Sequence, residues 1–451
     1  MYNEVINGCE VHRRENDMAQ INIDFNKITG KMKPVHGVGQ APMHTLRFNN
    51  LHYLTEAGIP FSRLHDMLIM TAHCNPVDIP GMFPDFSKDP KDPASYDFAF
   101  ADEIIKALFD AGVEPFWRLG VTFENFTAIK GYHVFPPKDP QKWAEICEGV
   151  IRHYTEGWAD GFRYDIRYWE IWNEPDNFET YPDNNGWAGT KEEYYELYDV
   201  TARHLKKCFP HLKIGGYASC GFYALTEMSA NAGKCSPRHG YFIEFLDGFL
   251  AYIKKTGAPL DFFSWHSYPE VPENLRVYAR YARERLDKDG YTNTETSLNE
   301  WNPRPELRGT AAHAAIIASC LSIMQEEPVD TGMFYDARMG VSLYGGMFNP
   351  MTQTPFPSYY SFMAFNSLYK LKNQCFADYD APLYVLAASD GKYGAVMISN
   401  PSGEDVELCA NIPGRVLEVK VIDSFRCLSP IGDKLPAAIG KDSVLLVNVE
   451  I

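Results

Sequence analysis

The sequence predicts an α/β protein built on a closed (β/α)8 barrel, with an accessory β-sandwich beside the barrel. Between about residues 35 and 371, eight short apolar runs alternate with eight helical stretches. Such a regular alternation favours a parallel sheet covered by helices. Both flanks of this region instead repeat with a period of two, which is typical of strands. The length of 451 residues exceeds one ordinary core, in agreement with a large barrel and a smaller unit.

The predicted barrel strands are apolar runs that end at turn or polar residues. They cover residues 35–39, 59–65, 113–120, 166–172, 212–217, 260–266, 296–301 and 331–336. The helical stretches cover residues 44–57, 95–111, 139–157, 190–208, 239–256, 273–289, 309–326 and 356–371. Thr190 and the pair Asp139-Pro140 are typical of helix starts.

The two flanks are predicted to form one β unit together. Residues 21–25 alternate between apolar and polar side chains, and Asp390-Gly391 joins two β runs in the pattern of a tight hairpin. The tail is small for an independent domain, so the N-terminal strand is expected to join it. The expected division is an N-terminal strand segment at 1–31, a catalytic barrel at 32–372 and a β-rich domain at 373–451.

Charge and cysteine usage exclude several classes of function. The net charge of −17 opposes binding to nucleic acid or to an anionic membrane. The most apolar helical segment, residues 311–324, is too short to span a bilayer. No signal-peptide pattern occurs at the start, and the ten cysteines contain no Cys-x-x-Cys pair. We therefore expect a reduced, cytoplasmic protein with no cofactor and no metal.

One connection in the predicted barrel is unusually long. Residues 67–94 carry five prolines and no helical period, and long irregular loops in compact domains are usually functional. Because this segment follows the second strand, we expect it to form a lip over a site at the C-terminal face of the barrel.

Polar side chains gather where the predicted strands end, which is where barrel enzymes carry their chemistry. They are Arg63, His65 and Asp66 at strand 2, Asn173 and Glu174 at strand 4, His266 and Tyr268 at strand 6, Asn299 and Glu300 at strand 7, and Tyr335 and Asp336 at strand 8.

Glu174 and Glu300 are the candidate catalytic pair. They are 126 residues apart, and strands 4 and 7 of an eight-stranded barrel lie on facing sides of its mouth. Two facing carboxylates are what glycoside hydrolysis requires, one as an acid and one as a nucleophile. Glu170 lies within strand 4 and is interpreted as structural, paired with a basic group. Trp301 is either a wall of a sugar pocket or a packing residue.

Several ordered motifs resemble glycoside hydrolase family 39, a clan A family that includes β-xylosidases and α-L-iduronidases. They are "YWEIWNEPD" (168–176), "VHGVGQAPMHTLR" (35–47), "FSRLHD" (61–66), "YDFAFADEIIKALFDAGVEPFWRLG" (96–120), "LDFFSWHSYP" (260–269), "NEWN" (299–302) and "YGGMFNP" with "PSYYSFMAFNSLYKL" (357–371). The resemblance covers about residues 32–372. Two features depart from it, namely Asn299 where the family often has Thr, and a longer segment at 121–137.

The resemblance implies a role for each candidate. Glu174 would be the general acid/base and Glu300 the nucleophile, with retention of configuration, and Asn173 would bind the hydroxyl next to the anomeric carbon. Arg63 would keep Glu300 ionised. The remaining candidates, His65, Asp66, His266, Tyr268, Trp301 and Tyr335, would bind the innermost sugar.

The expected function is a retaining exo-glycosidase of β-xylosidase type on plant-derived oligosaccharides. An enzyme of α-L-iduronidase or α-L-arabinofuranosidase type remains an alternative, and Arg304, Arg308 and Arg338 could supply the cation that a uronic acid needs. A catalytically silent sugar-binding barrel is the alternative from another class. The resemblance is also compatible with a homo-oligomer. A nucleotide site has little support, because "GVGQAP" (37–42) lacks the third glycine.

Overall fold

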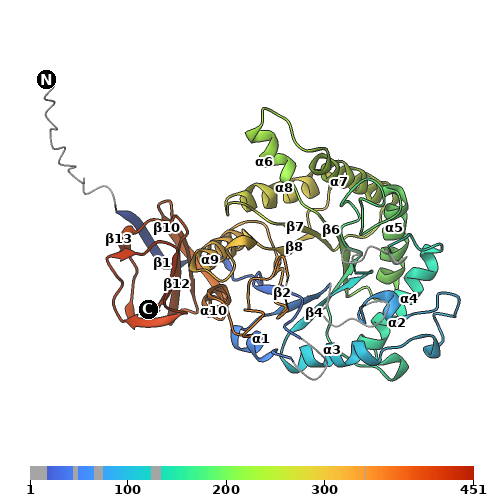
Figure 1. Ribbon diagram of the computed structural model, residues 1–451, viewed down its shortest axis with the longest axis horizontal. Coiled ribbons are helices and arrows are strands. Elements are labelled where there is room, and N and C mark those ends of the chain that lie inside the picture. The colour runs from blue at the N-terminus through green and yellow to red at the C-terminus, as the bar shows by residue number, and fades with distance from the viewer. Residues whose placement is uncertain (1–17, 44–48, 66–74, 123–133, 341) are drawn as a thin grey trace, which may run out of the picture.

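The computed structural model describes residues 18–43, 49–65, 75–122, 134–340 and 342–451. Eight parallel strands form a closed barrel and confirm the predicted fold class (Figure 1). Each strand pairs with the next in chain order, and the last pairs with the first. The barrel strands are β2 (Gly37–Gly39), β3 (Phe61–Leu64), β4 (Glu114–Leu119), β5 (Tyr168–Ile171), β6 (Lys213–Ser219), β7 (Phe262–Ser267), β8 (Glu295–Trp301) and β9 (Thr331–Phe334).

Large apolar side chains fill the end of the barrel interior that lies nearest the N-terminal ends of the strands. Phe61, Phe116, Tyr168, Phe262 and Met333 project inward from five different strands and form a buried cluster. A packed floor of this kind leaves the opposite, C-terminal end of the strands as the place where polar side chains can face a cavity. The barrel is therefore a solid support for a site at one face.

Helices surround the barrel, as the sequence pattern predicts (Figure 1). Thr190 caps its helix in a full capping box with Glu193, and the Asp139 side chain accepts from the backbone N–H of Lys142. The helices are α1 (His52–Ala57), α2 (Ile79–Met82), α3 (Ala99–Asp110), α4 (Pro140–Thr155), α5 (Lys191–Cys208), α6 (Tyr223–Ala230), α7 (Pro237–Thr256), α8 (Asn274–Asp289), α9 (Ala311–Glu326) and α10 (Pro357–Tyr369), with 3-10 turns at Pro93–Ser95, Trp158–Asp160 and Pro305–Leu307.

The N-terminal strand and the C-terminal region form one β unit, as expected. Its nine strands hydrogen-bond in a single order, β15-β14-β17-β12-β11-β10-β1-β13-β16, rather than in two separate sheets. They are β1 (Ala19–Lys31), β10 (Asn373–Tyr379), β11 (Tyr384–Ser389), β12 (Tyr393–Asn400), β13 (Val406–Asn411), β14 (Arg415–Ile422), β15 (Ser429–Gly432), β16 (Ala438–Ile439) and β17 (Ser443–Glu450). Within the sheet, β1 lies between β10, to which it is antiparallel, and β13, to which it is parallel.

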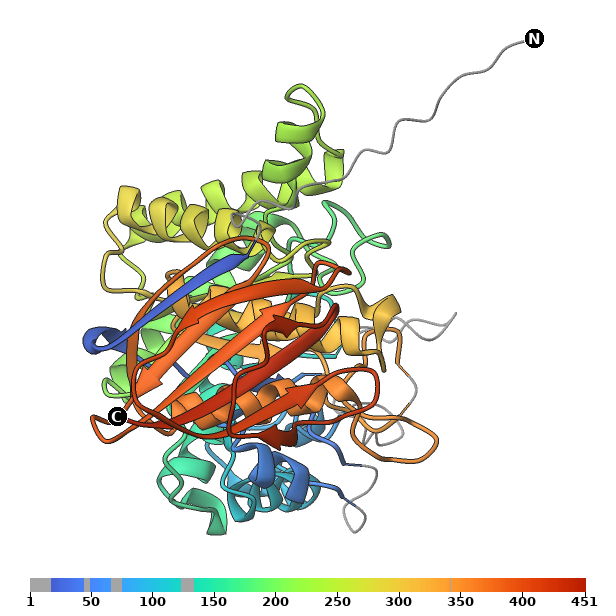
Figure 2. The same ribbon diagram turned by 90° about the vertical axis from the view of Figure 1, so that its left-hand side faces the viewer.

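Both faces of the central strands in this sheet are covered. Val396 and Ile398 of β12 point into a buried core to which β1, β13, β14 and β16 also contribute side chains. The strands at the ends of the sheet therefore pack around the same core as the central strands. The alternate residues Ala395 and Met397 belong to the core of the barrel. The helices α9 and α10 pack against that face, and Figure 2 looks onto the sheet with these helices behind it. The residue ranges of the expected domains stay a prediction.

The segment expected to form a lip after the second barrel strand is partly ordered into helix. Residues 67–74 lie outside the described residues, but Ile79–Met82 form a short helix whose apolar side chains are buried. The carboxylate of Asp78 anchors this helix, because it accepts from Arg118 at 2.6 Å and from the backbone N–H of Thr122 at 2.8 Å. This part of the segment is thus packed structure rather than an irregular loop. Among the described helices, none is both long and apolar enough to cross a membrane.

Candidate active site

The end of β5 turns two consecutive polar side chains toward the barrel mouth. Along the strand, Tyr168 and Glu170 face inward, and strict alternation would bring Trp172 inward next. Trp172 instead adopts a left-handed backbone conformation with φ of 72° and packs outward against Trp143 and Trp187. Glu174 also has a positive φ, 45°. Non-glycine residues in this region are uncommon and cluster at functional sites, and here the conformation presents Glu174 to a cavity.

A bulge in β8 has the same effect on the opposite side of the barrel. The register of β8 shifts between Leu298 and Trp301 against β9, and its pairing with β7 also shifts there. As a result, Asn299 and Glu300 both face the interior, where they contact Glu170 and Arg63. Bulges beside active sites commonly redirect a side chain in this way.

The two predicted catalytic glutamates lie close together at the barrel mouth. A carboxylate oxygen of Glu174 and one of Glu300 are within 4.8 Å of one another, with His266 of β7 beside both. The Nδ1 atom of His266 is 2.6 Å from Oε1 of Glu174, and its Nε2 atom is 3.5 Å from Oε2 of Glu300. Burial lowers the pKa of His266 to about 4, so the ring is neutral near pH 7. His266 therefore connects the two carboxylates without adding charge.

The carboxylate of Glu300 is hydrogen-bonded at both oxygens. Tyr268 donates to Oε1 at 2.5 Å, and Arg63 donates to Oε2 at 3.1 Å. The expectation that Arg63 lies beside Glu300 thus agrees with the geometry. The expected lowering of the pKa of Glu300, however, does not agree with the structure. Burial raises the pKa of Glu300 to about 7, and this outweighs the lowering by His266 and Arg63 while the charge of Glu174 adds to the rise.

Arg63 is the centre of a buried polar network. Its guanidinium donates to Glu170 through Nε at 2.8 Å and to Oδ1 of Asn173 through Nη2 at 2.5 Å, besides its bond to Glu300. Asn299 donates to the second oxygen of Glu170 at 2.5 Å. The side chain of Glu170 is fully buried, which agrees with the interpretation that it is structural and paired with a basic group. Asn299 occupies a position at which the family often has Thr, and here it contributes a donor to this network.

A cavity of about 520 Å³ opens above the two glutamates. The predicted residues that line it are Glu174, Glu300, His65, Tyr268 and Tyr335. Burial keeps the pKa of His65 well below its usual value, with the positive charge of Arg118 acting in the same direction. Asp66 lies outside the described residues. The structure thus brings five of the ten predicted site residues to one cavity wall.

The other predicted residues lie below the cavity surface or away from it. Arg63, Asn173 and His266 are buried beneath it and contact the glutamates or their partners. Trp301 requires a correction, because it does not line the cavity. It lies on the outer side of β8, fully buried, with its ring centroid 5.3 Å from that of Phe334 and 6.2 Å from that of Phe362. Alternation resumes after the bulge, so Glu300 faces inward and Trp301 faces outward.

Several lining residues were missed by reasoning from strand ends. They are Asn177, Phe178 and Asn185 in the connection after β5, Cys220, Tyr223, Arg238 and His239 in the connection after β6 and the start of α7, and Tyr344 after β9. These positions lie beyond the ends of the strands, most of them by several residues, so the period of the strand does not indicate where they point. The only signal was the length of the connections after β5 and β6.

The three arginines considered for binding a uronic acid do not line this cavity. Arg304 pairs with the exposed Glu306 beside a neighbouring cavity. Arg308 donates to the carbonyl groups of Ser342 and Leu343. Arg338 forms an ion pair of 2.8 Å with the buried Asp336. Each of these cations is therefore engaged elsewhere.

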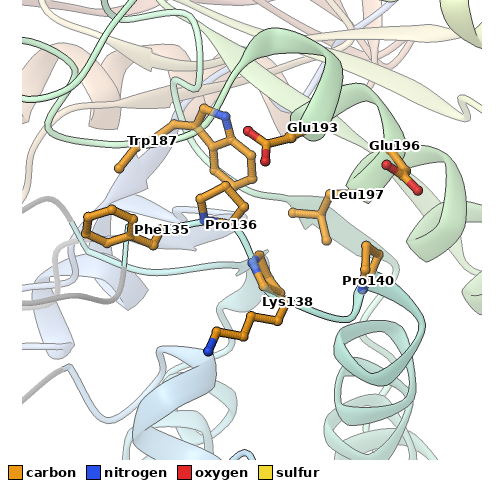
Figure 3. A pocket seen from close by; sticks show the side chains of 10 residues that line it. Phe135, Pro136, Lys138, Pro140, Trp187, Glu193, Glu196 and Leu197 are labelled. Atoms are coloured by element: carbon orange, nitrogen blue, oxygen red, sulfur yellow. The ribbon is translucent and has the colours of Figure 1, made fainter.

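A larger cavity of about 700 Å³ lies outside the barrel mouth, next to α4 and α5 (Figure 3). Phe135, Pro136 and Trp187 form one side, and Glu193 and Glu196 of α5 lie across from Lys138 (Figure 3). Its acidic residues are exposed on a helix and have no inward-facing carboxylate partner among the residues that line it. The smaller cavity is the candidate active site, because it contains the facing pair.

Among the residues that the structure describes, two clusters of side chains have the composition of metal ligands. One is Glu174, His266 and Glu300, and the other is Glu148, His204 and Cys208 between α4 and α5. In each cluster one carboxylate already pairs with an arginine, Glu300 with Arg63 in the first and Glu148 with Arg152 in the second. A cation would face this positive charge at close range. The expectation of no metal and no cofactor stays a prediction.

The closed barrel and the facing glutamates at the carboxyl ends of its strands define the chain as a (β/α)8 protein with a two-carboxylate site. The family model of glycosyl hydrolases family 39 matches residues 14–442. The chain belongs to that family.

Curated relatives and solved structures agree with this assignment. A β-xylosidase of Geobacillus stearothermophilus is 26% identical over 342 residues, which cover 67% of this chain and 61% of that protein. A β-xylosidase of Caldicellulosiruptor saccharolyticus is 29% identical over 188 residues, or 39% of this chain and 32% of that protein. The chain thus spans less than two thirds of the length of these relatives.

Among solved structures, a glucosidase from Croceicoccus marinus has a TM-score of 0.77 at 22% identity, covering 96% of this chain and 99% of the other. A monomeric β-xylosidase from Caulobacter crescentus has a TM-score of 0.67 at 19% identity, with the same coverage. At these identities the likeness establishes the fold, including the sheet beside the barrel.

Proposed function

We propose that the protein is a retaining exo-glycosidase that releases a terminal sugar, with β-xylosides as its preferred substrates. One observation carries the proposal, namely that carboxylate oxygens of Glu174 and Glu300 lie within 4.8 Å of each other. Retaining glycosidases hold their two carboxyl groups about 5–5.5 Å apart, whereas inverting ones leave about 6.5–9.5 Å for a water molecule. Membership of family 39 supports the same reaction.

In this proposal Glu300 is the nucleophile and Glu174 the general acid/base. A carboxylate oxygen of Glu300 attacks the anomeric carbon as the bond to the leaving oxygen breaks, and Glu174 gives its proton to that oxygen. Water then attacks the glycosyl ester, losing a proton to Glu174, and Glu300 leaves as a carboxylate. The hydrogen bonds from Arg63 and Tyr268 favour negative charge on Glu300 over Glu174.

The neutral ring of His266 supports this division of roles. Two carboxylates this close in a buried site do not ionise independently, so near neutral pH the pair holds one proton. Because Arg63 and Tyr268 donate to Glu300 and stabilise its ionised form, we place the shared proton on Glu174. His266 lies 2.6 Å from Glu174 and fixes the orientation of that carboxyl group, which makes it a positioning residue.

Asn173 is proposed to bind the hydroxyl next to the anomeric carbon. Its Oδ1 atom accepts from Arg63, which leaves the Nδ2 atom as the free donor of the amide. Nδ2 is buried and has no hydrogen-bond partner among the described residues. A buried donor without a partner is costly, and a substrate oxygen would satisfy it.

Xylose is proposed as the terminal sugar because both curated relatives are named β-xylosidases. Xylose requires no cation, and Arg304, Arg308 and Arg338 do not line the cavity. Exo action is proposed because the cavity is bounded by the connections after β5, β6 and β9. Catalysis is preferred over silent sugar binding because binding alone does not require a paired acid and nucleophile. A homo-oligomer and a cytoplasmic location stay predictions, and light scattering after gel filtration would measure the oligomeric state.

A panel of aryl glycosides tests the proposal. It contains β-xyloside, β-glucoside, α-L-arabinofuranoside and α-L-iduronide, each assayed with the wild type, Glu174→Gln and Glu300→Gln. We expect the β-xyloside to be cleaved with retention of configuration, as followed by NMR, and both variants to lose at least about a thousandfold in kcat/KM. Binding of xylose without cleavage of any substrate would establish the silent barrel instead.

Azide separates the roles of the two glutamates. In Glu174→Ala, azide is expected to attack the glycosyl ester and to give a glycosyl azide with the configuration of the substrate. In Glu300→Ala, it should replace the nucleophile directly and give the opposite configuration. The reverse pattern would exchange the two assignments.

A further inference from the structure

Arg238, at the start of α7, brings a positive charge to the wall of the candidate active site. It lines the same cavity as Glu174 and Glu300. Its backbone lies in the first turn of Pro237–Thr256, and the side chain reaches across to the connection after β5. The position of Arg238 at the site therefore depends on the connections after β5 and β6, which the pattern of the strands does not predict.

The guanidinium of Arg238 is held in one orientation. Its Nε donates to the carbonyl oxygen of Asn177 at 2.9 Å, and Nη2 donates to the side-chain oxygen of the same residue. The rings of Phe178 and Phe242 lie 4.6 Å and 5.0 Å from the guanidinium carbon. Such contacts orient an arginine and shield it from water, so little entropy is lost when it binds a ligand.

No carboxylate neutralises Arg238 among the residues that the structure describes. Its two bonded nitrogens face neutral oxygens of Asn177, and Nη1 has no hydrogen-bond partner in the same part of the chain. The other arginines at the barrel mouth behave differently, since Arg63 pairs with two glutamates and Arg338 with Asp336. In a chain of net charge −17, an oriented arginine without an acidic partner at a cavity wall indicates an anionic ligand.

The position of Arg238 indicates which part of the substrate it faces. Arg238, Asn177 and Cys220 line the cavity from the connections after β5 and β6, and Glu174 itself follows β5. Tyr335, Tyr344 and Glu300 line it from β8 and the connection after β9. The acid must contact the leaving oxygen, so its side of the cavity receives the leaving group.

We propose that Arg238 binds a carboxylate on the leaving group, so that the enzyme prefers glycosides in which the terminal sugar is attached to a hexuronic acid. This inference rests on the proposed function, because it uses Glu174 as the acid. A guanidinium binds a carboxylate through two parallel N–H donors. The alternative is that Arg238 only clamps the connection after β5 to α7.

Two disaccharides of one linkage separate these interpretations. Both carry the terminal sugar that the aryl panel identifies, one on glucuronic acid and the other on its carboxyl-reduced form, glucose. We expect the wild type to cleave the acidic disaccharide with a kcat/KM at least about tenfold higher, since glucose lacks the carboxylate that would accept charge-assisted hydrogen bonds from Arg238. Arg238→Gln should abolish this preference, and its kcat/KM should fall at least about tenfold more on the acidic disaccharide than on the glucose disaccharide or the aryl glycoside.

Arg304→Gln is the matched control, because it removes an arginine that is paired with Glu306 beside the neighbouring cavity. The preference for the acidic disaccharide should survive in this variant. An equal loss on both disaccharides and on the aryl glycoside in Arg238→Gln would assign Arg238 to the structural clamp. Equal cleavage of the two disaccharides by the wild type would also overturn the proposal.

Binding of free glucuronate gives a second readout that does not require turnover. Saturation-transfer NMR with glucuronate and glucose is expected to give a signal that is stronger for glucuronate in the wild type and lost in Arg238→Gln. If no aryl glycoside is cleaved but this binding persists, the proposed function fails and the anion site stands. If the aryl glycosides are cleaved but glucuronate binds both proteins alike, only the anion site fails.

Discussion

The hydroxyl of Tyr268 donates a hydrogen bond of 2.5 Å to Oε1 of Glu300. The tyrosine comes from the end of β7 and the glutamate from β8, so neighbouring strands of the barrel support the proposed nucleophile. This contact stabilises the ionised carboxylate, whereas burial raises the pKa of Glu300 to about 7. The reactive, ionised form therefore becomes populated as the pH rises through about 7.

Tyr268→Phe should move the acidic limb of the pH profile to higher pH. Without the hydroxyl, the ionised form of Glu300 loses a donor, and its pKa rises further above the ordinary value. We expect kcat/KM on the aryl β-xyloside to fall about tenfold at pH 6 and less at pH 8. The control is Tyr344→Phe, whose ring packs on Tyr268 and whose hydroxyl makes no hydrogen bond to Glu300. An unshifted limb in Tyr268→Phe would contradict this role.

His266→Gln should impair Glu174 more than Glu300. His266 lies 2.6 Å from Glu174 and only 3.5 Å from Glu300, so its loss should disorient the acid. We expect kcat/KM to fall about a hundredfold for a disaccharide, whose leaving oxygen needs a proton, and far less for a dinitrophenyl glycoside, whose leaving group does not. His313→Gln removes another buried histidine and is the control. Equal losses on both substrates would show that His266 acts through the nucleophile.

The positions of the barrel elements could be predicted because the alternation of apolar runs and helices is strong. The direction of a single side chain could be predicted only where its strand is regular. Arg63 of β3 and His65, which directly follows β3, both point to the site as expected. The left-handed conformation of Trp172 and the bulge at Asn299 cannot be seen in an apolar pattern, because such a pattern specifies neither the backbone conformation of one residue nor the register between strands.

The same limit explains the residues at which the predicted site differs from the structure. Trp301 follows Glu300 directly, and the sequence alone did not indicate which of the two faces the cavity. Arg238 begins a helix well beyond β6, so its approach to the cavity depends on how that long connection folds. The facing glutamates were predictable because each lies within three residues of the carboxyl end of a strand, and the closed barrel places those strands across its mouth.

Glu170→Gln should destabilise the protein although it leaves the proposed acid and nucleophile in place. Glu170 accepts a hydrogen bond from Nε of Arg63 and forms an ion pair with the same guanidinium, and both side chains are buried. Removing one partner of a buried ion pair typically costs about 3–5 kcal/mol, because the other charge stays buried without compensation. We expect a clear fall in the apparent melting temperature by calorimetry. In Asp110→Asn, which breaks the exposed pair with Lys106, the melting temperature should be unchanged.

Asp176→Asn should make stability less dependent on pH. Asp176 is fully buried, where it accepts from Oγ of Ser219 at 2.8 Å and from the backbone N–H of Cys220 at 3.1 Å. Burial raises its pKa to about 7 despite these bonds, and the nearby charge of Glu174 adds to the rise.

The sign of the effect follows from proton uptake. Between about pH 4 and pH 7 the folded chain holds a proton on Asp176 that the unfolded chain has lost, so folding becomes less favourable as the pH rises. Asparagine resembles the protonated acid in shape and does not titrate. The melting temperature of Asp176→Asn minus that of the wild type should therefore increase from pH 5 to pH 8, by an amount equivalent to a few kcal/mol at most. Every other titrating group is common to both proteins, so a difference that stays constant over this range would mean that Asp176 is already ionised at pH 5.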